Sequence, residues 1–592
     1  MPEGGLATEA STAPAAANAH GGFWARVDGE RWVKRLLIVA LCLWLVVVLV
    51  LPVLQLLVKS LADDQGGFVG LAHYAKYFNS PNLFVSLRNS LVVAVLTTLL
   101  SVGLGFGYAY ALARTTLFGR GLLKGIAMMP LFAPTLLNGI ALIYLFGRKG
   151  LVTTGMFGLL PGVDIGIYGP VGIVIAETLY AFPQAVLILV IALKMTDARL
   201  YEAAQSLGAS PLRIFFTVTL PGVRFGLMSA VFVCFILSFT DFGAPKVIGG
   251  NYSVLATDIY KQVIGQQNFS MGAVVSVVLL IPALLAFIAD RLVQRRQVAA
   301  FAARSVPLVP RPNPRRDAFF LAYCWLIGGV IGIFYLTALF ASLVKVWPYQ
   351  LELGLWHYHF SGTGGGGYGA FWNSLRMSAH SALWGTAITF LAAYLIEKTR
   401  QLHGLRQLAY FLSLAPLALP GMVIGLAYIF FFNARGWDIA GVFVANPFNW
   451  LYATMAILVL CNIVHFFSVS FLTATTALKQ MDREFETVSA SMGVPFTKTL
   501  VRVTVPVCLP AILEIGMYYF VNSMATVSAV IFLYSADLPL ASVAVANMDD
   551  AGDTANACAM SMLIVAANIL IRLMYGASTS GIRRRSQAWL TR

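Results

Sequence analysis

The chain has 592 residues, of which 59% are hydrophobic and only 11% are charged, and its formal net charge is +15. Soluble globular domains carry roughly 25% charged residues, so this composition excludes an ordinary water-soluble protein. A basic balance can indicate nucleic-acid binding, but here the Lys and Arg residues gather in the short segments between apolar stretches. We therefore predict a protein embedded in membrane lipid, with no nucleic-acid partner, whose positive charge reflects its orientation in the bilayer.

The N-terminal segment 1–35 begins with a stretch rich in Ala, Gly, Ser and Thr and is predicted to be a disordered cytoplasmic tail. The next stretch, 36–58, contains no charged residue and is long enough to cross a hydrocarbon core of about 30 Å. It is too long for the apolar region of a cleaved signal peptide, and no small-residue cleavage pattern follows it. We therefore predict it to be the first membrane span.

Further apolar stretches follow along the chain, and they predict an all-α fold, a polytopic membrane protein with about 12 transmembrane helices. Most Lys and Arg residues then fall on the side of the two chain ends, which predicts that both termini are cytoplasmic. The predicted spans are 36–58, 89–113, 123–146, 168–193, 224–248, 271–290, 318–342, 374–396, 407–432, 451–478, 508–533 and 556–577.

An Arg- and Pro-rich stretch separates the spans into two sets of six. It is short and polar, and its prolines cannot continue a helix. We therefore predict a first domain, 36–291, with spans one to six, and a second domain, 318–577, with spans seven to twelve. The cytoplasmic linker is 292–317, and a basic cytoplasmic tail, 578–592, follows the second domain.

The two sets of spans are an internal repeat with an offset of about 285 residues. Duplicated halves with six spans each share one orientation and are related by an axis along the membrane normal, with a solute path expected between them. The matching residues include Asn89 and Asn373, Pro130 and Pro416, Pro134 and Pro420, and Gly208 and Gly493.

The cytoplasmic segment between spans four and five has the sequence of two short helices joined by a turn. Its first part favours a helix, and small Ala residues allow another surface to approach closely. Gly208 permits the left-handed backbone that ends a helix, and Pro221 suits the first turn of span five. An ordinary amphipathic surface helix is the alternative. The residues of this pattern are Glu202, Ala203, Ala204, Gly208, Leu220 and Pro221.

The spacing of this segment resembles the coupling loop of the permeases of binding-protein-dependent ATP-binding-cassette (ABC) importers. It reads Glu-Ala-Ala, three residues, Gly, nine residues, an aliphatic residue, one residue, and Leu-Pro. The resemblance implies two tandem six-helix type I permease domains in a bacterial inner membrane. It also implies two ABC ATPase subunits docked on the loops and a periplasmic solute-binding protein that delivers a small-molecule substrate.

The second half carries a degenerate copy of the loop, 487–506. Counted back from its glycine, the three Glu-Ala-Ala positions hold no acid, because Glu486 lies one residue out of register. We therefore predict asymmetric coupling, in which Glu202 and Gly208 matter more than Gly493. The residues assigned to this second loop are Ala490, Gly493 and Pro506.

Ionisable residues at membrane depth are candidates for the solute path, because an unpaired buried charge is costly. The structural alternatives are a pairing of Asp241 in span five with Lys246 or a helix break at Gly243 and Pro245, and, for Glu177 in span four, a hydrogen bond to a neighbouring span. The candidate path residues of the two halves are Glu177, Ser238, Thr240, Asp241, Asn462, Asn522, Ser523 and Thr526.

No catalytic residue, metal site or cofactor is predicted. The chain has no G-x-x-x-x-G-K-[ST] phosphate loop, so ATP hydrolysis is expected in a separate subunit and the chain is not expected to be an enzyme. The six cysteines fall in or beside apolar segments without C-x-x-C spacing, and the seven histidines show no ligand spacing.

Segments 240–250 and 255–268 resemble the fused permeases of the 2-aminoethylphosphonate family. That resemblance implies phosphonate uptake, with ferric iron carried by the same machinery as an alternative. A secondary transporter that uses Asp241 and Glu177 as a proton relay is a second alternative. It would transport without an ATPase subunit.

Overall fold

The computed structural model describes residues 32–63, 66–300, 308–360, 365–399, 402–439, 442–482 and 484–587. Most of the predicted N-terminal tail, the centre of the predicted linker and the last five residues lie outside this part. The described chain is mostly helical, which confirms the predicted all-α class, and two short antiparallel hairpins accompany the helices.

In the first half, the span Trp32–Ser60 passes through a π-helical turn, η1 (Val46–Val50), into α2 (Leu51–Ser60). The elements that follow are α3 (Ala72–Asn79), α4 (Pro81–Arg114), α5 (Arg120–Ala127), η2 (Met129–Phe132), α6 (Thr135–Phe146), α7 (Gly155–Gly158), α8 (Pro170–Lys194), α9 (Ala198–Ser206), α10 (Pro211–Ile214), η3 (Phe215–Thr219), α11 (Leu220–Thr240), α12 (Gly243–Ile248), α13 (Leu255–Tyr260), η4 (Lys261–Gly265) and α14 (Phe269–Ala300).

In the second half, β1 pairs with β2 and β3 pairs with β4, with Val344 opposite Leu353 and Trp437 opposite Val444. The elements are α15 (Pro314–Leu343), β1 (Val344–Val346), β2 (Gln350–Leu353), η5 (Trp356–Tyr358), α16 (Gly367–Lys398), α17 (His403–Leu414), η6 (Ala415–Ala418), α18 (Gly421–Phe432), β3 (Gly436–Ile439), β4 (Val442–Ala445), η7 (Asn449–Leu451), α19 (Met455–His465), α20 (Phe467–Gln480), α21 (Glu484–Ser491), α22 (Phe496–Thr499), η8 (Leu500–Thr504), α23 (Val505–Ala525), α24 (Ala541–Asp550) and α25 (Thr554–Gln587).

Nine continuous helices of the described chain are long and apolar enough to cross a membrane. The three other predicted spans are broken. Span nine bends by 113° between Ala418 and Gly421, and span ten bends by 56° after His465. In span three the apolar helix α6 is a short piece of 12 residues that follows the separate helix α5. The nine continuous helices and the two bent spans agree with the prediction of about 12 transmembrane helices, which did not include the breaks within spans three, nine and ten.

Proline explains the breaks in spans three and nine. The residue before a proline is pushed out of the helical region of backbone space. Ala133, before Pro134, has φ −104° and ψ 143°, and Leu419, before Pro420, has φ −99° and ψ 115°. The chain is extended at both places, so each span divides into two pieces at equivalent positions of the repeat.

The first span of each half packs on the other half. Helix α2 lies against α18 and α14, and the Tyr428 hydroxyl donates to the carbonyl oxygen of Val48 over 2.8 Å. Helix α15 lies against α6, α4 and α25, and the Tyr335 hydroxyl donates to Asn138 Oδ1 over 2.9 Å. The two halves are thus interlocked rather than placed side by side.

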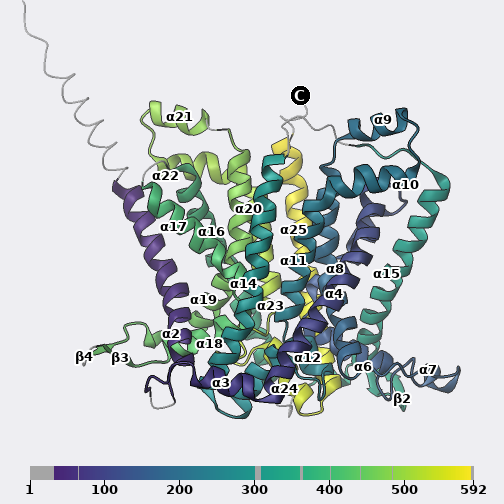
Figure 1. Ribbon diagram of the computed structural model, residues 1–592, viewed down its shortest axis with the longest axis horizontal. Coiled ribbons are helices and arrows are strands. Elements are labelled where there is room, and N and C mark those ends of the chain that lie inside the picture. Colours follow the sequence, from purple (N-terminus) through teal and green to yellow (C-terminus); the bar gives the residue numbers. More distant parts are fainter. Residues whose placement is uncertain are drawn as a thin grey trace, which may run out of the picture.

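The short helices between the spans gather at two opposite edges of the bundle. Figure 1 shows α9 and α21 at the edge where the C-terminal end of α25 also lies, and α3, α12, α24 and the hairpins at the opposite edge. Between these edges run α11 and α23, which are the least buried of the nine long helices. The repeat therefore places one loop of each half at the same edge and leaves α11 and α23 the most exposed.

Candidate functional site

The predicted loop of the first half folds as two helices joined at a glycine. The Asp197 side chain accepts from the Arg199 backbone N–H and begins α9. Gly208 follows α9 with φ +69°, a conformation that residues with a side chain rarely adopt. Ser210 then caps α10 by accepting from the Arg213 N–H over 3.3 Å. The predicted helix, turn and helix are all present.

A π-helical turn, η3, carries α10 directly into α11. Leu220 and Pro221 are the first two residues of α11, so they occupy the first turn of span five as the spacing predicts. Glu202 and Ala203 are exposed on α9, and Ala204 is half-buried. Leu207 next to the glycine is 86% exposed. An apolar side chain this exposed, beside a glycine turn, suits a surface that another protein covers.

A buried arginine attaches this loop to the bundle. Arg114, the last residue of α4, is 5% exposed and donates to the Leu193 carbonyl oxygen over 2.8 Å and to the Tyr201 hydroxyl over 3.1 Å. Its guanidinium also donates to the Thr196 hydroxyl and lies 4.8 Å from the centre of the Tyr201 ring. The Tyr201 hydroxyl continues to Thr219 in η3 over 3.1 Å. Helix α9 is thereby connected to spans two, four and five.

The loop of the second half has the same architecture with fewer polar contacts. Helices α21 and α22 flank Gly493, whose φ is +66°, and η8 leads into α23, with Pro506 in its first turn. Met492 occupies the place of Leu207 and is 73% exposed. The hydroxyl of Thr504, the counterpart of Thr219, is buried without a hydrogen-bond partner. The copy therefore keeps the backbone of the first loop but not the hydrogen bond at the Thr219 position; the side chains of Glu486 and Ala490 lie outside the described residues.

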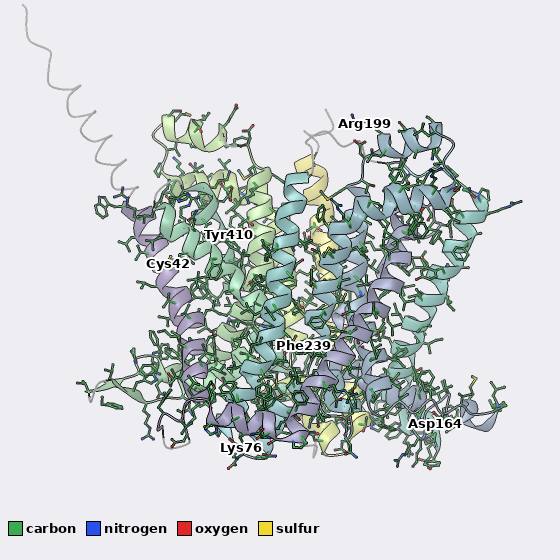
Figure 2. The ribbon with its side chains drawn as sticks, in the orientation of Figure 1. Cys42, Lys76, Asp164, Arg199, Phe239 and Tyr410 are labelled. Atoms are coloured by element: carbon green, nitrogen blue, oxygen red, sulfur yellow. The ribbon has the colours of Figure 1, made fainter. Side chains whose placement is uncertain are left out.

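The candidate path residues of the first half meet where span five ends. Helix α11 stops at Thr240, and Asp241 has extended backbone angles and accepts from the Ala244 N–H of α12 over 3.0 Å. Figure 2 places Phe239, two residues earlier, inside the bundle between Arg199 at one edge and Lys76 and Asp164 at the other. The helix break is therefore real, and Asp241 holds the start of α12.

Glu177 of α8 lies beside Asp241. It is 0% exposed, and its carboxyl group interacts directly with the Asp241 carboxyl group. No N–H or hydroxyl group of the described chain meets either Glu177 oxygen, so the interaction joins the two carboxyl groups themselves, which lie close enough to share a proton. The structure therefore brings together two acidic residues, Glu177 and Asp241, that lie 64 positions apart in the sequence.

The expected alternative partner of Asp241 is engaged elsewhere. Lys246 Nζ forms an ion pair with Asp550 Oδ1 at 2.9 Å and lies 4.7 Å from the centre of the Tyr260 ring. Pairing of Asp241 with Lys246 is therefore wrong. The ion pair joins α12 of the first half to α24 of the second, which lie together in Figure 1. Burial, and then the neighbouring Asp550, raise the pKa of Asp549 to about 6, while Lys246 lowers it.

The counterparts in the second half are neutral. Asn462 donates to the Leu458 carbonyl oxygen over 3.0 Å and to Met377, so its amide N–H₂ is engaged within that half. Asn522 likewise donates to the Tyr518 carbonyl oxygen over 2.8 Å. Thr526 ends α23 as Asp241 ends α11. The hydroxyls of Ser238 and Ser523 are buried without hydrogen-bond partners.

Sequence reasoning missed Arg114 and Tyr180 at these sites, and it assigned no role to two further ionisable residues within the spans, His465 and Glu514. In the sequence, nothing distinguishes Arg114 from the other basic residues at the predicted cytoplasmic ends of the spans. Tyr180 interacts electrostatically with both acidic residues, and the repeat places His465 at the equivalent position of the second half. Glu514 lies on the exposed side of α23 at membrane depth. The repeat offset was the available signal for His465, and membrane depth was the signal for Glu514.

Within the described part of the chain, no three His, Cys, Asp or Glu side chains lie close enough together to hold a metal ion. All six cysteines are free and buried in that part.

Comparison with known proteins agrees with this arrangement. The family described as "binding-protein-dependent transport system inner membrane component" matches residues 101–298 and again 385–584. The ferric transport system permease protein FbpB of Actinobacillus pleuropneumoniae is 26% identical over 418 residues, which cover 69% of this chain and 58% of that protein. A putative ferric transport system permease protein FbpB 1 of Haemophilus influenzae is 28% identical over 384 residues, 63% of this chain and 57% of that protein.

The chain therefore spans less than two thirds of the length of these two ferric relatives. A putative 2-aminoethylphosphonate transport system permease protein, PhnU of Salmonella typhi, is 26% identical over 248 residues, 41% of this chain and 86% of that protein. The family match occurs twice and covers more than half of the chain. The protein belongs to the inner membrane components of binding-protein-dependent transport systems, as a multi-pass permease in which two such domains are fused.

Proposed function

We propose that this chain supplies both transmembrane halves of an ATP-driven importer. Two ABC ATPase subunits bind the loops around Gly208 and Gly493 from the cytoplasm, where both termini also lie. A periplasmic solute-binding protein docks on the opposite edge and delivers a small solute. The observation that carries the proposal is the pair of helix–glycine–helix loops, each with an exposed apolar side chain, at one edge of the bundle.

The proposed mechanism is alternating access. When the ATPases close on ATP, they move α9 and α21, and the π-helical turns η3 and η8 pass this motion directly to α11 and α23. These two helices carry Asp241 and Thr526 at their far ends, so the path between the halves opens outward there. Hydrolysis in the separate ATPase subunits resets the bundle. In this mechanism the chain supplies the binding surfaces and the helices that transmit the conformational change, and it catalyses no chemical step.

For the solute, we propose 2-aminoethylphosphonate, with ferric iron as the second candidate. The first is supported by the likeness of segments 240–250 and 255–268 to that family and by the relative named PhnU. The second is supported by the relatives named FbpB. In either case the solute-binding protein sets much of the selectivity.

The test is to purify the chain in detergent together with candidate ABC ATPase subunits and solute-binding proteins from the same organism. We expect two ATPase subunits per chain to co-purify and the loaded binding protein to stimulate ATP hydrolysis several-fold. The solute that produces this stimulation identifies the substrate. A chain that moves solute in liposomes without any ATPase subunit would instead be a secondary transporter, and the loops would then be dispensable.

A second prediction concerns the ion pair between Lys246 and Asp550, which ties the two halves together at the outer edge. The Lys246→Met variant is expected to ease opening and to raise ATP hydrolysis in the absence of binding protein. Side chains as exposed as these, 19% and 45%, contribute at most about 1 kcal/mol, so the increase should not exceed roughly fivefold.

The exchange variant Lys246→Asp with Asp550→Lys provides the control, because it restores an ion pair with reversed polarity. Basal hydrolysis should return toward the wild-type value in the exchange variant. Equal hydrolysis by the wild-type, the single variant and the exchange variant would show that the pair does not hold the outer edge closed.

A further inference from the structure

We propose that Glu177 and Asp241 form a binding site for the positively charged part of the transported solute, and that this site belongs to the first half alone. The inference rests on the proposed import function and specifies the chemical class of the solute. It starts from Glu177, which is fully buried and whose two carboxyl oxygens meet no N–H or hydroxyl donor of the described residues; only the Asp241 carboxyl group lies against them.

Among the described residues, no cationic side chain interacts with either acidic group. The other groups that do are Thr135, Tyr180 and the backbone N–H groups of Phe242 and Ala244, none of which is cationic. Lys246, the closest basic residue in sequence, is held by Asp550 and by the Tyr260 ring. Burying a carboxylate without a partner costs several kcal/mol in a low-dielectric interior. A second carboxylate beside it adds to that cost, so the site favours the arrival of positive charge.

A purely structural role accounts for only one of the two residues. Asp241 accepts from the Ala244 N–H and so fixes the start of α12. An asparagine side chain has the same acceptor oxygen, so that role needs no negative charge. Glu177 caps no helix, and within the described residues no donor meets either of its oxygens. The charge of the pair is therefore free to act on a ligand.

The position of the pair suits a solute path. Asp241 is half-buried, and it stands at the end of α11, one of the two least buried long helices. Tyr518 of α23 interacts electrostatically with Tyr180, so the pair lies near the surface where the second half faces the first. A solute that passes between α11 and α23 would reach Asp241 first, with Glu177 behind it.

The second half offers different chemistry at the equivalent positions. Asn462 replaces Glu177 and Thr526 replaces Asp241 on nearly identical backbone, with φ and ψ of −71° and 138° at Thr526 against −70° and 142° at Asp241. The Ser523 hydroxyl of this half is buried without a partner and can serve a neutral or anionic group. The solute is therefore expected to bind in one orientation, with its positive end toward the first half.

This arrangement selects a chemical class. An ammonium group or a ferric ion gains from two adjacent carboxyl groups, whereas sulfate or molybdate, which carry only negative charge, would be repelled. Ammonium and ferric iron are two sources of the same positive charge. The experiment must therefore present them separately.

The test uses the complete complex in liposomes, with its ATPase and loaded binding protein, and measures uptake of 2-aminoethylphosphonate, ferric citrate and sulfate. Whichever positively charged solute the wild-type complex carries, Glu177→Gln and Asp241→Asn should each lower its uptake at least tenfold. Glu177→Asp, which retains the charge, should keep at least a third of the rate. ATPase stimulation by the binding protein should stay within twofold in all variants, since the docking surfaces are unchanged.

Glu397→Gln is the matched control, because it neutralises a carboxylate whose cationic partner, Lys479, lies 3.9 Å away. Its uptake should match the wild type. Wild-type uptake in both Glu177→Gln and Asp241→Asn, or uptake of sulfate in place of the two positively charged solutes, would overturn the inference. Loss of ATPase stimulation in the wild-type complex would instead count against the proposed import function.

Discussion

Replacing Gly208 by valine is expected to lower transport more than tenfold while leaving the bundle folded. The backbone at Gly208 has φ +69°, and a residue with a side chain pays about 1–2 kcal/mol to adopt this conformation, with valine at the upper end. A Cβ atom at this position meets no atom within 4 Å in the chain itself. The added side chain therefore projects from the loop, toward the surface that the proposed ATPase covers.

The measurement is solute uptake beside ATPase co-purification. Gly119→Val is the matched control, because Gly119 has φ +68° and equally open surroundings but precedes α5 rather than a coupling helix. It imposes the same strain and should transport normally. The equivalent change at Gly493 is expected to cost less than the change at Gly208. Equal loss in the Gly119 and Gly208 variants would assign the effect to backbone strain alone.

Replacing Arg114 by methionine is expected to uncouple transport from ATP hydrolysis. The variant keeps the bulk of the side chain and removes the donors that join Leu193, Thr196 and Tyr201. Each buried polar group left without its partner costs about 1–3 kcal/mol, and α9 loses its connection to the spans. We expect uptake to fall at least tenfold while stimulated hydrolysis remains above half of the wild-type rate.

The ratio of solute imported to ATP hydrolysed separates this role from simple misfolding, which would lower both together. Tyr201→Phe retains the ring beneath the guanidinium and loses only the hydroxyl, so it should show an intermediate ratio. Arg224→Met removes an exposed arginine of α11 and should behave as the wild type. An unchanged ratio in Arg114→Met would mean that the loop transmits motion without this anchor.

The loop was predictable because its structure depends on local chemistry. A capping Asp197, a glycine with positive φ and a proline in the first turn each act within a few residues, so sequence spacing reports them directly. The equivalent path positions were also predictable, because the repeat projects each residue of one half onto the other.

The breaks in the spans were not predicted, because hydropathy reports the length and composition of an apolar segment and not whether its helix axis changes direction. Pro134 and Pro420 carried the signal, since each forces the residue before it into an extended conformation. The same apolar stretch can therefore be one straight helix or two pieces, and only the proline positions distinguish the two outcomes.

Contacts between distant segments lay beyond sequence reasoning for a different reason. Lys246 has an acid five residues before it, yet its ion pair forms with Asp550 of the other half. Arg114, at the end of α4, binds Leu193 of α8 and Tyr201 of α9, which only the fold brings to it. Charge spacing along a chain predicts an ion pair only where one helix carries both residues. Asp241 and Lys246 do not share a helix, because α11 ends before Asp241 and Lys246 lies on α12.

The packing of each half's first span on the other half has a consequence for the synthesis and membrane assembly of the chain. The carbonyl oxygen of Val48 accepts a hydrogen bond from the hydroxyl of Tyr428, which lies 380 residues further along the chain. At translation rates of about 5–20 residues per second, Tyr428 is synthesised roughly 20–80 s after Val48. Of the two helices that α2 contacts most, α18 belongs to the second half, whereas α15 meets α6 and α4, which are already made when it emerges. The two first spans therefore meet their partners at different stages of synthesis.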